Sequence, residues 1–360
     1  MTMIKHLYVH VPFCRTICSY CDFCHRVYDK KSAELYLNRI KEETKECSDN
    51  YETIYIGGGT PTALSDEELD KLLSNFDNYS KKVKEYTIEA NPESLTESKI
   101  NIFLKHNINR ISMGLQSSDD SELKLMNRHH SFDDVKDKVN LLRDKGINNI
   151  SIDIMYSLPG QTMESLKKTV KDALSLKVPH LSLYSLTVEE NSVFGKKGYK
   201  SLDEDTEADM YEYIVDTLVK YGYHQYEIAN FCLPGYESKH NLGYWHYDDY
   251  LALGPGSTSK YNHQRIEKTN NIKTYLNNSE LIENIEILSN EDEAFENLMM
   301  SLRLEEGLNI SVFKDKYGFN PLDYYSEAIK KNSNYLKVND NHLICTDREI
   351  LNHILVDFLG

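Results

Sequence analysis

The chain has 360 residues and a formal net charge of −16 at pH 7, with 40% hydrophobic and 27% charged residues. This composition is that of a globular protein, long enough for one large domain and a small one. The negative charge argues against nucleic acid as the main partner, because phosphate binding needs clustered lysine and arginine. No apolar run approaches membrane-spanning length, so no integral membrane segment is expected.

Short apolar runs alternate with amphipathic helices over the first 200 residues. Helices are expected after Ser65, which with Glu68 forms a capping box, and after Ser131 and Thr162. Six strands, each followed by a helix, imply a parallel sheet, and six units fall short of the eight that close a full barrel. We therefore predict an α/β fold, an open, partial (β/α)6 barrel over residues 1–200. The predicted strands are His6–Val11, Thr53–Ile56, Tyr86–Glu89, Arg110–Gly114, Ile150–Ile154 and His180–Leu186.

The remaining chain is expected to form an elaboration and a small second domain. Residues 201–275 contain a predicted helix around Met210–Lys220 and an aromatic-rich loop, and Asn277–Glu293 is predicted to be partly linker. Residues 290–360 are predicted to form a winged-helix-like α+β domain. Its predicted helices are Ala294–Leu302, Ile310–Tyr317, Pro321–Lys330 and one from Asp347, and its predicted strands are Tyr335–Val338 and His342–Cys345.

Cys14, Cys18 and Cys21 have the spacing C-x3-C-x2-C. Three thiolates fit an iron–sulfur cluster with one open iron, whereas a closed cluster or a structural zinc site takes four protein ligands. Zinc is the alternative, because Cys24 brings four thiols within eleven positions.

The other three cysteines, Cys47, Cys232 and Cys345, are isolated, and isolated cysteines are more often small buried hydrophobes than ligands. Seven cysteines, an odd number, fit a reducing compartment better than a disulfide framework. The N-terminal segment MTMIKHLYVHVPFC is too short and too interrupted for a signal peptide, so a cytoplasmic location is expected.

With Tyr20 before the third cysteine, the loop resembles the signature of radical S-adenosylmethionine proteins. The run VPFC…YCDF is similar to the branch that contains oxygen-independent coproporphyrinogen III dehydrogenases and heme chaperones, and the resemblance covers nearly the whole chain. It implies that Cys14, Cys18 and Cys21 hold a [4Fe–4S] cluster whose open iron chelates S-adenosylmethionine. An electron delivered into the sulfonium would release methionine and a 5′-deoxyadenosyl radical.

A glycine-rich turn follows the second predicted strand. A tight turn is the simple interpretation of such glycines, which adopt positive φ and let the backbone approach a ligand. The segment resembles the GGTP motif of the radical family, which implies that its backbone receives the amino group of S-adenosylmethionine. The residues are Gly57, Gly58, Gly59, Thr60 and Pro61.

Four polar residues at or near strand ends match further family positions. The resemblance implies that Glu89 accepts a hydrogen bond from the ribose, and that Gln116 and Arg128 hold the ribose or carboxylate end. Asp153 lies within a buried run, where a lone carboxylate is costly, so a cofactor hydroxyl or Arg128 is expected as its partner. Tyr8 matches a position that packs near the methionine end.

The run His240-Asn-Leu-Gly-Tyr-Trp245 contains a histidine and two aromatic residues, one of which is the chain's single tryptophan. A packed aromatic loop is one interpretation. The run also matches the H-N-x-x-Y-W motif of heme chaperones, which implies heme binding with His240 as a candidate axial ligand. Only 13 residues precede Cys14, and Cys24 lies one residue later than in the C-x3-C-x2-C-x-C loop of the dehydrogenases. Both departures favour the chaperone.

The resemblance therefore implies a heme chaperone with an iron–sulfur cluster and S-adenosylmethionine. Its expected partners are heme, a heme-acceptor protein and an electron donor for the cluster. The alternative is oxidative decarboxylation of coproporphyrinogen III to protoporphyrinogen IX, and the sequence leaves open whether S-adenosylmethionine is cleaved productively. A nucleic-acid-modifying radical enzyme is disfavoured by the net charge.

Overall fold

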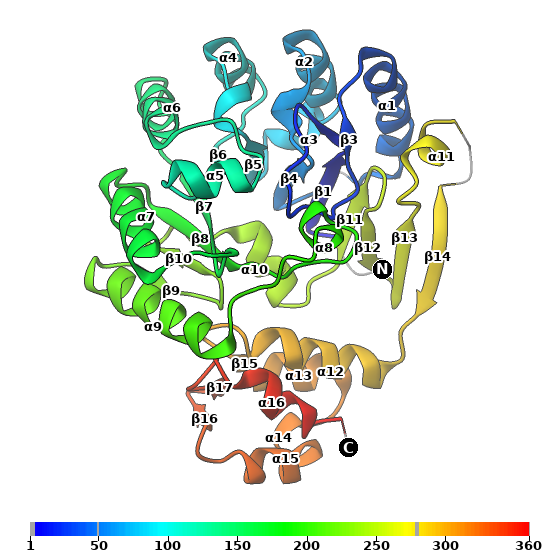
Figure 1. The fold of residues 1–360 in the computed structure, drawn as a ribbon. Helices are drawn as coiled ribbons and strands as arrows, with labels where there is room; N and C mark the ends of the chain where they lie inside the picture. The colour runs from blue at the N-terminus through cyan, green and yellow to red at the C-terminus, as the bar shows by residue number, and fades with distance from the viewer. Residues whose placement is uncertain (1–3, 49, 278–280, 360) are drawn as a thin grey trace.

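The computed structural model describes residues 4–48, 50–277 and 281–359, and it centres on one twelve-stranded sheet (Figure 1). Six adjacent strands are parallel, and these are the six predicted from the sequence. Their burial is nearly continuous, as expected for parallel strands covered on both faces. In sheet order they are β1 His6–Val11, β4 Thr53–Gly58, β5 Glu85–Ala90, β6 Arg110–Gln116, β7 Ile150–Tyr156 and β8 His180–Ser185.

Beyond β1 lies β11 (Tyr250–Leu253), a seventh parallel strand that the sequence did not predict. Antiparallel strands extend the sheet past β11 on one side and past β8 on the other, and the described strands do not close into a barrel. The predicted linker 277–293 is corrected, because it contains strand β14 (Ile282–Ile287), which pairs with β13; its residues 278–280 lie outside the described part. The other extending strands are β12 Thr258–Tyr261, β13 Gln264–Lys268, β10 Asn230–Cys232 and β9 His224–Gln225.

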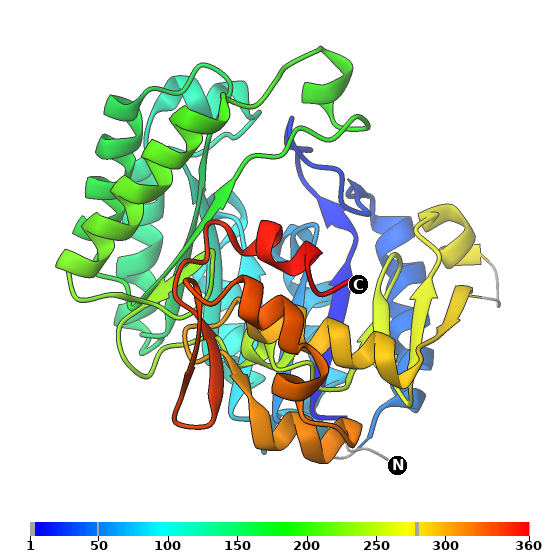
Figure 2. The same ribbon diagram turned by 90° about the horizontal axis from the view of Figure 1, so that it is seen from below.

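Helices form an outer layer around the parallel strands (Figures 1 and 2). The helices predicted to begin after Ser65, Ser131 and Thr162 are all present, and each begins with a capping box, which was predicted only at Ser65. The longer helices are α1 Lys30–Glu43, α2 Asp66–Ser74, α4 Glu97–Lys105, α6 Phe132–Asp144, α7 Met163–Ser175 and α9 Glu204–Lys220. The shorter elements are β2 Phe13–Cys14, β3 Arg26–Val27, α3 Asp77–Ser80, α5 Asp120–Leu125, α8 Val193–Lys196, α11 Ile272–Asn277, and 3-10 turns at Thr44–Glu46, Pro61–Ala63 and Pro92–Ser94.

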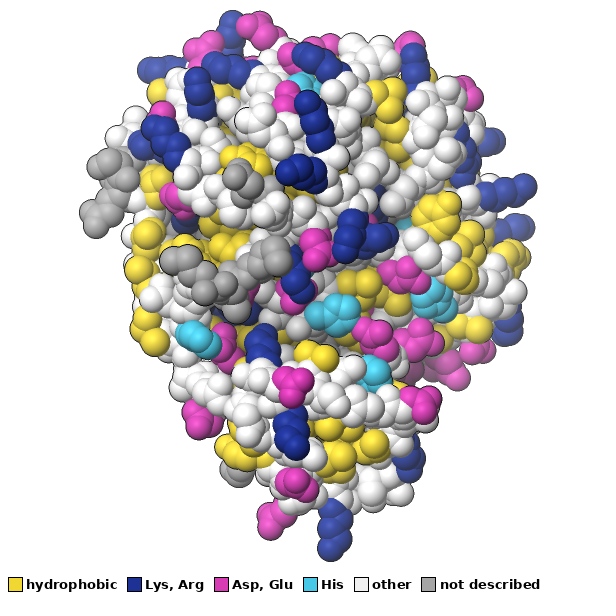
Figure 3. Space-filling view, turned by 180° about the vertical axis from the view of Figure 1, so that it is seen from behind, with side chains coloured by type: hydrophobic (Ala, Val, Ile, Leu, Met, Phe, Trp, Pro, Cys, Tyr) yellow, Lys and Arg dark blue, Asp and Glu magenta, His cyan; other side chains and the backbone are white. Residues whose placement is uncertain are grey.

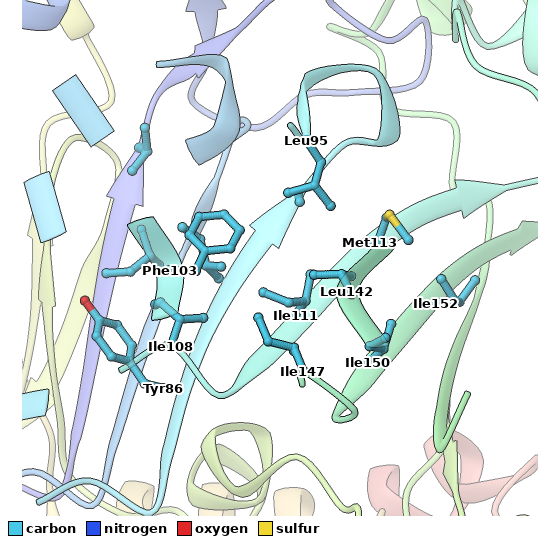
Figure 4. Close-up of a cluster of buried hydrophobic side chains, with 14 of the residues drawn as sticks. Tyr86, Leu95, Phe103, Ile108, Ile111, Met113, Leu142, Ile147, Ile150 and Ile152 are labelled. Carbon is cyan, nitrogen blue, oxygen red and sulfur yellow. The ribbon is translucent and has the colours of Figure 1, made fainter. Parts of the chain in front are cut away.

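The main core lies between the sheet and these helices. Figure 4 shows Phe103 of α4 and Leu142 of α6 packed over the strands beside Ile111 and Ile150. Each such side chain contributes about 1.5–3 kcal/mol on burial. Met210 and other residues of the 201–275 segment belong to the same core, so this segment is part of the barrel body. The expected aromatic loop within it contains a helix, α10 (Lys239–Trp245).

A second core holds the C-terminal residues together below the sheet in Figure 1. The order of three helical segments, a β-hairpin and a last helix confirms the winged-helix-like prediction. The helix predicted over Pro321–Lys330 is two helices, because Tyr325 (φ −100°, ψ 27°) interrupts it, and the last helix begins at Leu351 instead of Asp347. The elements are α12 Asn290–Ser301, β15 Leu308–Asn309, α13 Ile310–Tyr317, α14 Pro321–Tyr324, α15 Ser326–Lys331, β16 Leu336–Asn339, β17 His342–Cys345 and α16 Leu351–Val356.

Surface charge is mixed. On the face shown in Figure 3, lysines and arginines are interspersed with acidic side chains. Within the described residues, no helix combines the length and apolar character that crossing a membrane requires.

Candidate functional site

Three of the four N-terminal cysteines share one cleft. Cys14, at the end of β2, and Cys18 and Cys21 in the following loop line a cavity of about 510 Å³. Cys24 is absent from this lining, and its thiol donates a hydrogen bond to the carbonyl oxygen of Asn270 at 3.2 Å. The structure thus groups three thiols, as a three-ligand cluster requires, and directs the fourth elsewhere.

The glycine-rich turn after β4 closes against the backbone next to Cys14. The Gly59 N–H donates to the Val11 carbonyl at 2.8 Å, and the Thr60 N–H donates to the Phe13 carbonyl at 2.7 Å. A Cβ atom on Gly59 would lie 2.9 Å from the Phe13 oxygen and 3.0 Å from the Cys14 sulfur. Only glycine fits here without displacing the cysteine.

Three of the five predicted residues of this turn line the cleft: Gly58, Gly59 and Thr60. Gly57 and Pro61 do not, since Gly57 packs on the Glu89 carboxylate and Pro61 begins a 3-10 turn. The N–H groups of Gly58, Gly59 and Thr60 already donate to acceptors within the protein. An ammonium group is itself a donor, so the backbone carbonyl oxygens of this turn are the atoms that could accept its hydrogen bonds.

Glu89 ends β5 inside the cleft. Tyr55 donates its hydroxyl to Oε1 at 2.8 Å, and the Gly58 N–H donates to Oε2 at 3.1 Å, so two bonds fix the carboxylate. Burial raises the pKa of Glu89 to about 7, and the nearby Asp153 adds to the rise. A buried carboxyl with a raised pKa is a common feature of binding sites.

Gln116 and Arg128 meet in the same cleft. The register shift between Gly114 and Gln116 is a β-bulge, and Gln116 has φ +66°. Bulges of this kind re-aim side chains next to functional sites. Arg128 donates to the Cys18 sulfur at 3.5 Å, to Asn91 Oδ1 at 2.9 Å and to the Gly114 carbonyl at 3.0 Å. Its buried Nε has no hydrogen-bond partner among the described residues, so the cleft offers a donor to an anionic group.

Asp153 lies on β7 and lines the cleft. Its partner is the hydroxyl of Ser112, which donates to Oδ1 at 3.0 Å. The alternative that Arg128 serves as partner is corrected, since the guanidinium is held by Asn91 and Gly114. Burial raises the pKa of Asp153.

Tyr8 is placed differently from the expectation. It does not line the cysteine cleft but a second, adjoining cavity of about 780 Å³, where its hydroxyl shares a hydrogen bond with His10 Nδ1 at 3.0 Å. Cys24 lines the same cavity. The two cavities share a wall made of Phe23, Gly58, Glu89, Tyr184 and Asn241.

Helix α10 separates the histidine of HNLGYW from its other polar and aromatic residues. Asn241, Tyr244 and Trp245, spaced i, i+3 and i+4, line the larger cavity. His240 does not. It is 1% exposed and packs against the sheet, where Nδ1 meets Thr53 Oγ1 at 2.7 Å and Nε2 meets the Tyr244 hydroxyl at 2.8 Å.

The same face of α10 carries Gly243, where a Cβ atom would lie 2.3 Å from the His6 ring. The glycine therefore lets the helix approach β1 closely. Burial, followed by the effects of His6 and Arg110, lowers the pKa of His240 well below its usual value, so the ring is neutral.

The cavity continues to the C-terminal domain. Glu296, Met299 and Met300 of α12 line its far side, together with Lys260 and Arg265 from β12 and β13. Both cations are paired, Lys260 with Asp249 at 3.0 Å and Arg265 with Glu296 at 2.7 Å.

Sequence reasoning missed several lining residues. Asn91 bridges Thr60 and Arg128, and its signal was an asparagine two residues after a predicted strand end. Arg110 is fully buried and lines the cysteine cleft. Its signal in the sequence was a charged residue at the start of a predicted apolar strand. The methionines of α12 carried no local signal, because their position depends on how the second domain packs.

Comparisons with known proteins identify the family of the chain. The model of the Radical SAM superfamily matches residues 8–173, and the HemN C-terminal domain matches residues 288–351. The chain is 37% identical to the heme chaperone HemW of Lactococcus lactis, over 98% of this chain and 96% of the relative. The chain belongs to the HemW family of radical S-adenosylmethionine proteins. It is also 36% identical to the HemW of Bacillus subtilis, over 88% and 87% of the two chains.

The fold of this HemW-family chain is similar to that of a solved enzyme. The structure of the coproporphyrinogen III oxidase HemN from Escherichia coli matches with a TM-score of 0.84 at 20% identity, covering 99% of this chain and 90% of that one. At this identity the likeness concerns the fold.

Proposed function

We propose that the chain is a heme chaperone that binds a [4Fe–4S] cluster, S-adenosylmethionine and heme, and passes heme to an acceptor protein. The observation that carries this proposal is the pair of adjoining cavities. One contains three grouped thiols, and the other is lined by the aromatic residues of HNLGYW and by the C-terminal domain. The names of the curated relatives support heme as the ligand.

In the cysteine cleft, Cys14, Cys18 and Cys21 would hold the cluster. When bound, the cluster would supply one electron to S-adenosylmethionine, with an external protein as electron donor. The unpaired Nε of Arg128 and the bulged Gln116 would bind the carboxylate or ribose end. Thr60 and the glycine carbonyls would meet the amino group.

Glu89 and Asp153 would take the cofactor's hydroxyl groups, because both carboxylates are already oriented by neighbouring donors. The wall shared with the larger cavity would then shield the cofactor on the side of Tyr184 and Asn241. Excluding water from such a cleft strengthens its electrostatic interactions.

In the larger cavity, heme would lie between α10 and α12. Its volume of about 780 Å³ falls within the range of roughly 300–1,000 Å³ typical of small-molecule sites. Tyr244 and Trp245 offer aromatic contact area, and the propionates would meet Arg265 and Lys260 by replacing their partners Glu296 and Asp249.

His240 stays a candidate iron ligand, but only if the ring leaves Thr53 and Tyr244. In the arrangement described above it is a positioning residue for α10. Tyr244→Phe separates the two roles, because it frees His240 Nε2 without removing the ring. If His240 binds iron, Tyr244→Phe keeps or strengthens heme affinity and His240→Ala changes the heme absorption spectrum. If His240 only positions α10, both variants weaken binding without a new ligand signature.

The cluster assignment is tested with single alanine variants reconstituted without oxygen. Alanine at Cys14, Cys18 or Cys21 is expected to abolish the visible absorption of the cluster. The matched control, Cys24→Ala, is expected to keep it. Loss of the cluster in the control would contradict the three-ligand set.

The competing function is the oxidative decarboxylation of coproporphyrinogen III to protoporphyrinogen IX. The reconstituted protein is incubated with that substrate, reductant and S-adenosylmethionine, and heme is titrated in parallel. A chaperone binds heme stoichiometrically and leaves the porphyrinogen unchanged. Rapid conversion of the porphyrinogen would reject the chaperone proposal and identify a dehydrogenase.

A further inference from the structure

Three metal-binding side chains converge at one edge of the sheet, outside both cavities. They are His224 of β9, Cys232 of β10 and Glu237 of the loop that precedes α10. One donor atom from each lies within 4.8 Å of the other two. His224 Nε2 lies 3.0 Å from Glu237 Oε1 and 3.8 Å from the Cys232 sulfur. We propose that these residues form a zinc site.

The distances suit that ion. Zinc bonds of 2.0–2.3 Å in tetrahedral geometry place donor atoms roughly 3.4–3.6 Å apart, and the two measured separations lie on either side of this range. Imidazole nitrogen, thiolate sulfur and carboxylate oxygen are all ordinary zinc ligands. Binding the ion would replace the direct His224–Glu237 hydrogen bond and bring the three donor atoms, which already lie within 4.8 Å of one another, to these separations.

The backbone holds the three residues in this arrangement. Cys232 and His224 are directly opposite in the antiparallel β9–β10 pair. A turn closed by the Tyr236 N–H on the Leu233 carbonyl, with Gly235 at φ +88°, brings Glu237 back over the strand. Burial raises the pKa of the Cys232 thiol to about 12, and the Tyr236 N–H, which the same turn directs at the sulfur, offsets this rise only in part.

The site has an open side. Cys232 is fully buried, whereas the His224 and Glu237 side chains are 30% and 28% exposed. Three protein ligands leave the fourth zinc position to water, and the partial exposure of two ligands gives that water a route to solvent. Binding would release the thiol proton of Cys232 to solvent.

Another histidine with two acidic neighbours lacks this convergence. His106 bonds Asp77 through Nδ1 and Asp70 through Nε2, so its carboxylates lie on opposite sides of the ring and cannot share an ion with one nitrogen. At His224, by contrast, both partners approach Nε2.

The position of the site defines its role. Glu237 is followed directly by Ser238, the N-cap of α10. A zinc ion would therefore fasten the β9–β10 edge to the first turn of the helix that carries HNLGYW. With three protein ligands and one water the site differs from a closed structural zinc site, and it does not depend on the cluster or on heme.

The test uses the full-length, cluster-loaded protein, in which the cluster occupies the thiols of Cys14, Cys18 and Cys21. After chelator treatment, Zn²⁺ is titrated against a competing chelator, and one ion per chain is expected. Cys232→Ser and Glu237→Gln are each expected to weaken binding by more than about tenfold, the loss that even outer-shell partners of metal sites cause. Co²⁺ difference spectra should show a thiolate-to-metal band that Zn²⁺ displaces and Cys232→Ser lacks.

Three control variants remove similar groups elsewhere. Cys345→Ser removes another buried thiol, Cys24→Ala removes the remaining thiol near the cluster, and His246→Gln breaks a His–Glu pair that has no cysteine. All three should bind zinc as the parent does. Because Glu237 is partly exposed, Glu237→Gln keeps the test valid if Cys232→Ser does not fold. Unchanged zinc affinity in Glu237→Gln, or a cobalt band retained in Cys232→Ser, would overturn the proposal.

Discussion

Glu85→Gln is expected to destabilise the protein and to weaken heme binding while leaving the cluster intact. Glu85 begins β5 and is 2% exposed. One carboxylate oxygen accepts from the His240 N–H at 3.0 Å and the other from the Lys239 N–H at 3.0 Å. The buried carboxylate thus holds the first turn of α10. Its negative charge also stabilises the positive charge of the buried Arg110.

The magnitude follows from these contacts. In the glutamine variant, the amide NH₂ group faces one of the two N–H donors, and an unpaired buried donor costs about 1–3 kcal/mol. The other bond changes from charge-assisted to neutral, which costs about 1 kcal/mol more. We expect a loss of about 3 kcal/mol in the free energy of unfolding, measured by urea denaturation, and weaker heme binding by titration.

The control is Glu52→Gln. Glu52 pairs with Lys84 at 2.6 Å on the surface, where the Lys84 and Glu52 side chains are 62% and 41% exposed. Exposed pairs contribute about 0–1 kcal/mol, so this variant should unfold close to the parent. If Glu85→Gln were as stable as Glu52→Gln and bound heme normally, the carboxylate would not be what fixes α10, and the reasoning would fail.

Three further results are expected. The raised pKa of Glu89, about 7, means that the folded state retains this proton more tightly than the unfolded state, so stability is lost as pH rises from about 4.5 to 7. Glu89→Gln removes this dependence. The change in the free energy of unfolding between pH 5 and pH 8, measured by urea denaturation, should therefore differ between variant and parent by on the order of 3 kcal/mol. Parallel pH profiles of the two proteins would contradict the raised pKa. Gly59→Ala should lower the iron content after reconstitution, because the added Cβ meets Cys14; full iron content would show that the turn relaxes. Ser131→Ala removes an N-cap and should cost about 1 kcal/mol in urea denaturation without affecting iron or heme, and any loss of either would be unexpected.

The sequence predicted the parallel sheet because its strands are buried on both faces and therefore appear as short apolar runs. It missed β11 and β14 for different reasons. Tyr250–Leu253 is only four residues long, whereas Ile282–Ile287 has isoleucines at 282, 285 and 287 without regular alternation, and all six residues are exposed. A strand that is held mainly by backbone hydrogen bonds to its neighbours, with few buried side chains, has only a weak hydrophobic pattern in its sequence.

Site placement was predictable where family motifs and strand ends coincide. Glu89, Gln116, Arg128 and Asp153 all line the cleft that contains the three cysteines. Tyr8 was misplaced because motif matching gives no side-chain direction. Its hydroxyl meets His10 on the same strand face, two residues along, and so points into the larger cavity.

The helical spacing of HNLGYW also has a consequence for the roles of its residues. Positions 240 and 243 face the sheet, whereas 241, 244 and 245 face the cavity, because residues three and four apart share a side of a helix. Tyr244 belongs to both groups, since its hydroxyl meets His240 while its ring lines the cavity. A ligand that displaces this ring would break a hydrogen bond to His240, and the freed Nε2 would then be available to iron. Under the proposed function, the same histidine would pass from a positioning role to a ligand role once its bonds to Thr53 and Tyr244 are broken.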